Sequence, residues 1–332
     1  LQAVSGWTLS ADKMMLTKTY TANATENVTI KDLAGNTTTV TVKVANIEKT
    51  ELTAVVTYSI TELTNQNVVA TIKANKQLQA ISGWTLLSDK QTMIKTYTGN
   101  KTETVTIKDL AGNTATVTVK IANIDKTAPT AQVSYSTTEL TNKNVVVTIK
   151  ANKQLQEISG WTLLSDKQTL TKTYTSNTTE TVTIKDLAGN TATVTVKIEN
   201  IDKTAPTAQI SYSTTELTNQ DVVVTIKASE QLQTLSGWTL STDKLSLTKT
   251  YTNNTTENVT IKDLAGNTAT ANVKIINIDK TEPIAQVSYS ATELTNQDVI
   301  VTIKVNKQLQ VINGWTLLSD KQTLTKTYTS NT

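Results

Sequence analysis

The chain has 332 residues, a formal net charge of +3, and no cysteine, histidine or phenylalanine; arginine is also absent. The lack of cysteine and histidine removes disulfides, thiolate catalysis, the commonest general base and the commonest transition-metal ligand. The lack of arginine removes the bidentate grip on phosphate or guanine, and the interspersed charges form no basic face. We therefore expect no enzymatic activity, no cofactor and no nucleic-acid partner.

One motif recurs at a constant step along the whole chain. Successive tryptophans are 77 residues apart, at Trp7, Trp84, Trp161, Trp238 and Trp315. The run Lys-Asp-Leu-Ala-Gly-Asn keeps the same step, starting at Lys31, Lys108, Lys185 and Lys262. A fixed period indicates one structural unit copied head to tail. The spacing predicts complete repeats at 50–126, 127–203 and 204–280, with a C-terminal part of a repeat at 1–49 and an N-terminal part at 281–332.

Repeat 127–203 shows the expected elements in order. Apolar residues alternate with polar ones over 131–135 and 145–149, which is the period of a strand, and a polar turn separates the two segments. A short segment follows at 161–163, and alternation resumes over 169–174 and 181–184. The run 186–190 predicts a tight turn, in which Gly189 takes a positive φ. The last strand is expected at 194–198.

This pattern predicts an all-β fold without helices. About seven short alternating strands per repeat are typical of an antiparallel sandwich. About one residue in five is threonine, a β-branched type that suits a pleated, half-buried surface. Partial repeats at both ends leave a sandwich open. We therefore expect a natural chain that is longer at both ends, or ends that neighbouring molecules complete.

The junctions between repeats are short. The segment Asn-Ile-Asp-Lys-Thr-Ala-Pro occupies 123–129 and 200–206, whereas the first junction, at 47–52, has no proline. Proline fixes φ and restricts the preceding residue. Short linkers that mostly carry proline predict a tandem array of sandwiches in an elongated, semi-rigid rod.

The turn and last strand at 185–196, followed by 201–207, resemble the bacterial immunoglobulin-like (Ig-like) repeats of Gram-positive cell-surface proteins. The resemblance covers every repeat. It implies an Ig-like sandwich and a place in stalks, adhesin shafts or surface appendages, with the working domain often elsewhere in the chain. A secreted chain without cysteine also fits a Gram-positive surface.

Three groups of residues have competing interpretations. Trp84, Trp161 and Trp238 are expected in the core, since Trp161 shares strand parity with Leu163, but repeated tryptophans could also stack on sugars. Asp125, Asp202 and Asp279 in the junctions are weak calcium candidates, because Lys126, Lys203 and Lys280 follow them directly. The favoured interpretation is that these aspartates cap turn amides.

Lys172 and Glu180 share inner strand parity, as do Lys95 with Glu103 and Lys249 with Glu257. A spontaneous Lys–Asn isopeptide cross-link needs such an amine and acid, but no asparagine lies at an inner position. A snorkelling lysine with a strand-end glutamate is the simpler interpretation.

The sequence favours a non-enzymatic, extracellular structural protein: the tandem Ig-like shaft of a bacterial surface adhesin or a fibrous appendage. Its expected partners are neighbouring copies of the chain, which would form a filament. The alternative is a multivalent array that binds carbohydrate or another host ligand. No apolar run approaches the ~20 residues of a membrane span, so no membrane insertion is expected in this window.

Overall fold

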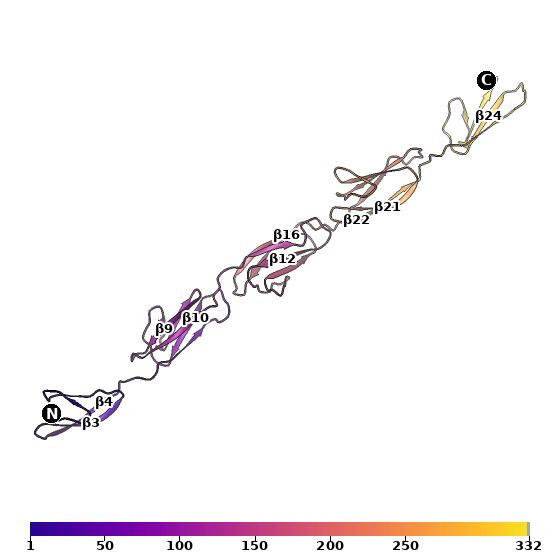
Figure 1. Cartoon of the computed structure of the whole chain (residues 1–332). Coiled ribbons are helices and arrows are strands. Elements are labelled where there is room, and N and C mark those ends of the chain that lie inside the picture. Colours follow the sequence, from indigo (N-terminus) through magenta and orange to yellow (C-terminus); the bar gives the residue numbers. More distant parts are fainter. Residues whose placement is uncertain (331–332) are drawn as a thin grey trace. The chain divides into compact units, whose positions relative to one another are not determined.

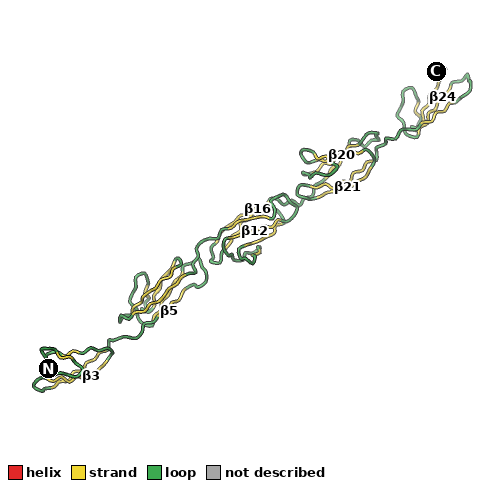
Figure 2. The backbone as a smooth tube through the Cα atoms, viewed as in Figure 1, coloured by secondary structure: helices red, strands yellow, loops and turns green. Residues whose placement is uncertain are grey.

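The computed structural model describes residues 1–330, and strands, turns and loops make up this part of the chain (Figure 2). No helix occurs in residues 1–330, and so none is long and apolar enough to cross a membrane. Threonine, valine and isoleucine dominate the strands, and their branched Cβ atoms favour extended backbone. The predicted all-β class is confirmed.

The chain divides into two compact units. The first contains Leu1–Ser136, Val146–Tyr174 and Thr178–Lys197, and the second contains Thr137–Val145, Thr175–Asn177 and the chain from Ile198 onward. The predicted repeat 127–203 contributes to both units. Repeat 50–126 lies wholly in the first unit and repeat 204–280 wholly in the second.

Repeat 50–126 consists of a four-stranded and a two-stranded antiparallel sheet. The larger sheet has the order β5-β6-β8-β7 and contains β5 (Ala54–Tyr58), β6 (Val68–Ala74), β7 (Thr85–Leu86) and β8 (Thr92–Tyr97). The smaller sheet is the hairpin of β9 (Lys101–Lys108) and β10 (Thr114–Ile121), which Figure 1 labels. The Tyr58 hydroxyl accepts a 3.0 Å hydrogen bond from the Lys120 amide, which ties β5 to β10.

The same pair of sheets recurs twice with the same strand order. In the next repeat the strands are β11 (Ala131–Tyr135), β12 (Val145–Ala151), β13 (Thr162–Leu163), β14 (Thr169–Tyr174), β15 (Thr178–Lys185) and β16 (Thr191–Ile198). In repeat 204–280 they are β17 (Ala208–Tyr212), β18 (Val222–Ala228), β19 (Thr239–Leu240), β20 (Ser246–Tyr251), β21 (Thr255–Lys262) and β22 (Thr268–Ile275).

The two terminal segments contain parts of this pattern. Residues 1–49 form two two-stranded sheets, β1 (Thr8–Leu9) with β2 (Leu16–Thr17) and β3 (Ala24–Lys31) with β4 (Thr37–Val44). Residues 281–330 form one four-stranded sheet from β23 (Ala285–Tyr289), β24 (Val299–Val305), β25 (Thr316–Leu317) and β26 (Thr323–Tyr328).

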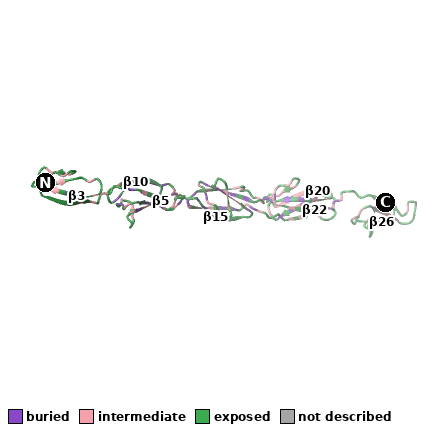
Figure 3. Ribbon diagram, turned by 90° about the horizontal axis from the view of Figure 1, so that it is seen from below, coloured by how far each residue is buried: buried purple, intermediate pink, exposed green. Residues whose placement is uncertain are grey.

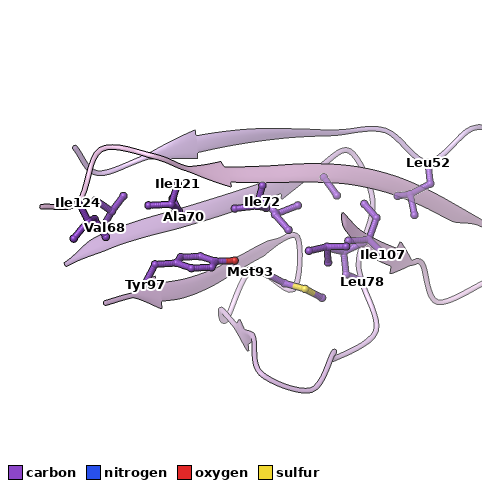
Figure 4. Close-up of a cluster of buried hydrophobic side chains, with 13 residues drawn as sticks. Leu52, Val68, Ala70, Ile72, Leu78, Met93, Tyr97, Ile107, Ile121 and Ile124 are labelled. Carbon is purple, nitrogen blue, oxygen red and sulfur yellow. The ribbon is translucent and has the colours of Figure 1, made fainter. Parts of the chain in front are cut away.

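A single cluster of buried side chains joins the two sheets of repeat 50–126. It takes alternate residues from each strand, as a pleat requires. Its members include Val68, Ala70 and Ile72 of β6, Met93 and Tyr97 of β8, and Ile107 and Ile121 of the hairpin (Figure 4). Burying one such aliphatic side chain contributes roughly 1.5–3 kcal/mol. The core therefore depends on both sheets, as in a sandwich.

Repeat 204–280 has an equivalent core, built around Val222, Val224 and Ile226 of β18 and Val273 and Ile275 of β22. Burial varies along the chain: inward residues of β22 are buried, whereas most of β3 is exposed or half-buried (Figure 3).

Each complete repeat has six strands instead of the expected seven. The segments around Leu155 and Thr141 make only single bridges, to Asp186 and Ile201. The strand after Trp161 has two residues because tight turns flank it. Gly160 has φ 78° before it, and Lys167 has φ 56° after it.

The predicted turn at 186–190 is present. Gly189 has φ 97°, a conformation that favours glycine, and the Gly189 amide donates to the Asp186 carbonyl at 3.1 Å. The Asp186 carboxylate accepts a hydrogen bond from the Asn190 amide at 2.8 Å, which closes the turn.

Candidate functional site

Lysine, tryptophan, tyrosine and glutamate meet in each complete repeat. In repeat 50–126, Lys95 and Tyr97 project from one face of β8, because residues two apart share a face. Glu103 lies on β9 of the other sheet. The Lys95 ammonium is 2.6 Å from Glu103, and the Tyr97 hydroxyl donates to the same carboxylate oxygen at 2.6 Å. The cluster therefore ties the two sheets together.

The same ammonium lies over two aromatic rings. Lys95 Nζ is 5.6 Å from the centre of the Trp84 ring and 5.2 Å from that of Tyr97, within the range of a cation–π interaction. Each of the other tryptophans has an equivalent lysine over its ring: Lys18 over Trp7, Lys172 over Trp161, Lys249 over Trp238 and Lys326 over Trp315. A sugar that stacked on this face of the indole would have to displace the ammonium.

The five tryptophans are half-buried. Trp84 and Trp238 pack against the buried core clusters of their repeats without joining them. In Trp161 and Trp238 the ring meets the neighbouring tyrosine edge-on, with ring centres 6.4 and 6.3 Å apart. The indole thus lies at the margin of the core, with part of its surface exposed.

The glutamate of this cluster is ionised at neutral pH and the tyrosine is neutral. Hydrogen bonds from Lys101, Lys95 and Tyr97 lower the pKa of Glu103 to about 2. Burial, and then the hydrogen bond to Glu103, raises the pKa of Tyr97. In residues 1–49 the hydrogen bond to Glu26 raises the pKa of Tyr20 to about 12. Such a charged glutamate beside a neutral tyrosine suits a structural ion pair better than proton transfer.

Lys172 and Glu180, the isopeptide candidates, do meet. The Lys172 ammonium is 3.0 and 2.9 Å from the two Glu180 oxygens and 4.9 Å from the centre of the Tyr174 ring. The contact is an ion pair, and it differs from the amine–amide pair that a Lys–Asn cross-link requires.

A second cluster surrounds the junction aspartate Asp125. The Lys153 ammonium lies 2.7 Å from Asp125 Oδ2, 2.6 Å from the Thr127 carbonyl oxygen and 3.4 Å from Asp186 Oδ2. The Asn190 side-chain amide donates to the Asp125 carbonyl at 2.8 Å. Hydrogen bonds from the Lys153 ammonium and the Thr127 backbone amide lower the pKa of Asp125. We call this arrangement the junction cage: a central position surrounded by two carboxylates and one carbonyl.

The junction cage recurs at the same step. Around Lys76 its oxygens come from Glu48 at 3.1 Å, the Thr50 carbonyl at 2.5 Å and Asp109 at 3.5 Å. Around Lys307 they come from Asp279 at 2.7 Å and the Thr281 carbonyl at 2.6 Å. These three cages each hold an ammonium. Two of the calcium candidates, Asp125 and Asp279, thus form ion pairs with a lysine.

The cage of Asp202, the third calcium candidate, differs. Glu230 occupies the position of the lysine, and Asp202, Glu230 and Asp263 place carboxylate oxygens within 4.8 Å of one another. Asp263 is buried, with 1% of its surface exposed. Burial, followed by the charges of Asp202 and Asp263, raises the pKa of Glu230.

The lysines that directly follow the junction aspartates do not enter the cages. Lys126 binds the Asn67 side chain at 2.6 Å, Lys203 binds Asn144 at 2.8 Å and Lys280 binds Asp221 at 2.5 Å. Contrary to the prediction from the sequence, these three lysines therefore do not place a positive charge inside the cages. The expected capping by the aspartates is present, since the amides of Thr127 and Thr204 donate to Asp125 and Asp202 at 3.0 Å.

Backbone hydrogen bonds link consecutive repeats within each unit. The Asn65 amide donates to the Ala188 carbonyl at 2.9 Å in the first unit, and the Asn142 amide donates to the Ala265 carbonyl at 3.0 Å in the second. Asn65 and Asn142 are 77 residues apart, as are Ala188 and Ala265. The same contact is therefore made twice.

A groove over the sheet of 281–330 is lined by Tyr289, Val299, Val301, Trp315 and Tyr328, among others. The equivalents of Val299 and Val301 in repeat 204–280, Val222 and Val224, are fully buried in the core. The groove is thus the face that a hairpin covers in a complete repeat.

No described protein family and no curated protein matches the chain. Two solved structures show a distant likeness, each at 9% sequence identity. One is a protein crystallised with a xylogluco-oligosaccharide, with 73% of this chain and 71% of that chain covered and a TM-score of 0.22. The other is native Escherichia coli alpha-2-macroglobulin, with 87% and 27% covered and a TM-score of 0.19. Scores this low carry no argument about fold or function.

Proposed function

We propose that the chain is a non-enzymatic, tandem Ig-like shaft of a bacterial surface protein, outside the cell. The observation that carries the proposal is the repetition of one junction at a constant step. Asn65 and Ala188 form the same hydrogen bond as Asn142 and Ala265. A chain that copies both its domain and its junction serves a spacing role, because each added copy extends the array by one more identical step.

The Ig-like assignment rests on three features of the complete repeats. Each has two antiparallel sheets over one core, a Gly-containing turn between the last two strands, and the sequence of that turn and strand that resembles Gram-positive Ig-like repeats. The strand number is lower than in a full constant-type sandwich, since two segments are reduced to single bridges.

The proposal is tested by small-angle scattering of the chain in dilute solution, together with surface labelling of the native cells. We expect an extended profile and labelling by antibody on intact cells. A compact profile, or labelling that requires permeabilised cells, would contradict it. Comparison of dilute and concentrated samples also tests for lateral association into filaments, which repeated surfaces would favour.

A second candidate is an array that binds carbohydrate through the tryptophans, favoured by the partial exposure of all five indoles. Repetition would give avidity to weak sites. Lys172 over the face of Trp161 opposes this function. Glycan-array binding that is lost in Trp161→Ala but kept in the folded Lys172→Met variant would support the second candidate over the shaft.

A further inference from the structure

The four junction cages each contain a junction acid, which is Glu48, Asp125, Asp202 or Asp279, but they differ in the residue at their centre. Positions 76, 153 and 307 are lysine, and position 230, at the same 77-residue step, is glutamate. In the lysine cages the ammonium is held by a junction acid and a threonine carbonyl, as Lys153 is by Asp125 and Thr127. The junction acid and the threonine carbonyl therefore contact an ammonium in three copies, and the acid equivalent to Asp263 does so in two, as Asp109 and Asp186.

The exchange of lysine for glutamate changes the charge of the cage. Two carboxylates and an ammonium, as around Lys153, have formal charges that sum to −1, whereas the formal charges of Asp202, Glu230 and Asp263 sum to −3. Asp263 remains buried, as Asp186 does, with 1% and 2% of their surfaces exposed. Like charges this close and partly withdrawn from water repel strongly unless a cation compensates them.

Asp263 is held by the same asparagine hydrogen bond as Asp186. Asp186 Oδ2 accepts from both the Asn190 side chain and the Lys153 ammonium, at 3.0 and 3.4 Å. Asp263 Oδ2 accepts from Asn267 at 2.8 Å, which corresponds to the first of these bonds. One carboxylate oxygen of Asp263 lies within 4.8 Å of one oxygen of Glu230 and one of Asp202.

We propose that a calcium ion occupies the centre of the Asp202–Glu230–Asp263 cage, in place of the ammonium of the other three. The three carboxylates and the Thr204 carbonyl, equivalent to that of Thr127, would supply protein ligands, and water would complete the shell. Calcium takes six to eight oxygen ligands in flexible geometry, and this cage offers oxygen ligands only. Magnesium demands a stricter octahedron and gives up its water reluctantly, so it fits less well.

The rest of the cage differs little between the two repeats. Asn152, which precedes Lys153, caps the Thr130 amide at 2.9 Å, and Ser229, which precedes Glu230, caps the Thr207 amide at 3.0 Å. The loop is therefore held in the same way in both, and the central residue is the change that matters for the ion.

The test is calcium titration of the whole chain by isothermal calorimetry after removal of metal with chelator. We expect one calcium per chain in the range of extracellular calcium modules, roughly 10⁻⁴–10⁻³ M. Glu230→Lys should abolish this binding, because the new ammonium fills the cage as Lys153 does. Glu230→Gln keeps the size of the side chain, and its affinity should fall at least tenfold.

The reciprocal variant is Lys153→Glu, which places three carboxylates around Asp125 and should raise the stoichiometry to two. Circular dichroism and the thermal unfolding profile confirm that each variant is folded. Absence of calcium binding to the native chain, binding that survives Glu230→Lys, or equal affinity for magnesium would overturn the proposal. Failure of Lys153→Glu to gain a second calcium would overturn the role given to the central residue. None of these outcomes bears on the proposed shaft, whose test is the scattering profile.

Discussion

The Lys95 ammonium lies 2.6 Å from the Glu103 carboxylate, and this contact joins the four-stranded sheet to the hairpin of repeat 50–126. Both side chains are largely buried, with 25% and 18% of their surfaces exposed. Its counterparts are Lys18 with Glu26, Lys172 with Glu180 and Lys249 with Glu257. A polar contact at the edge of the core therefore accompanies the apolar packing inside it.

Because of Glu103, the free energy of unfolding of repeat 50–126 should depend on pH in the acidic range. Its pKa falls from 4.5 to about 2 on folding, so its contribution is complete above about 4.5 and is lost as the pH falls through about 2. Glu103→Gln should cost about 1 kcal/mol at neutral pH and nothing below that window. Hydrogen exchange of residues 92–108 in the whole chain, measured across this range, checks the prediction. A difference between variant and native chain that persists unchanged at the acid end would refute it.

Trp161→Ala should destabilise its repeat by about 2–3 kcal/mol, less than a fully buried tryptophan costs, because the indole is only half-buried. Leu170→Ala provides the comparison: Leu170 is 0% exposed, and its truncation should cost about 3–4 kcal/mol. Local hydrogen exchange in β12 and β14 gives both values. The prediction is wrong if the tryptophan variant is the less stable of the two.

Lys153→Met should loosen the junction, because it leaves Asp125 and the buried Asp186 without their ammonium. The backbone amides of residues 125–128 and 130 should exchange faster than in the native chain, and those of β15 and β16 should change little. Lys150→Met is the control, since Lys150 pairs with the exposed Asp166 outside the cage. Equal effects of the two variants would show that the cage contributes nothing specific.

Gly189→Ala should cost about 1–3 kcal/mol, because φ at this position is 97° and a Cβ disfavours that conformation. Contact with the Asn65 side chain adds little, since the nearest atom would lie 3.5 Å from the new Cβ. Gly99→Ala is the matched control: a Cβ there meets nothing within 4 Å and φ is not positive, so stability should stay the same or rise. Hydrogen exchange at 186–190 and at 98–101 reports the two effects.

The positions of the strands could be predicted where the alternation of apolar and polar residues was bounded by residues typical of turns. The alternation of Val145, Val147 and Ile149 corresponds to three fully buried residues, and the turn at Gly189 has the expected positive φ. The alternation also predicted that Lys172 and Glu180 lie on the inner faces of their two strands, because side chains two apart on a strand share a face. In the structure they meet there. The reduced strand number was not predictable, since single bridges such as Leu155 with Asp186 leave no alternation in the sequence.

The junction cage was missed because its members come from three separate segments. Asp125, Lys153 and Asp186 share no motif, and adjacency in sequence pointed to Lys126 instead. Neighbouring residues of an extended chain point to opposite sides, so Lys126 turns away to Asn67. One signal was available in the sequence: the repeated Asn-Lys-Gln-Leu-Gln becomes Ser-Glu-Gln-Leu-Gln at 229–233.

The hairpins of neighbouring repeats have the same strand lengths and the same turn, as β15–β16 and β21–β22 illustrate. Each could therefore close the sheet of its neighbour during folding, a misassembly typical of repeat proteins. One difference between these two hairpins is matched across the strands: Asn258 and Asn272 hydrogen bond at 2.7 Å where the preceding repeat has Thr181 and Thr195. This matched change keeps the contact inside the hairpin. The hairpin can consequently be inherited as a block, and recombination between repeats would exchange whole hairpins without breaking a contact inside them.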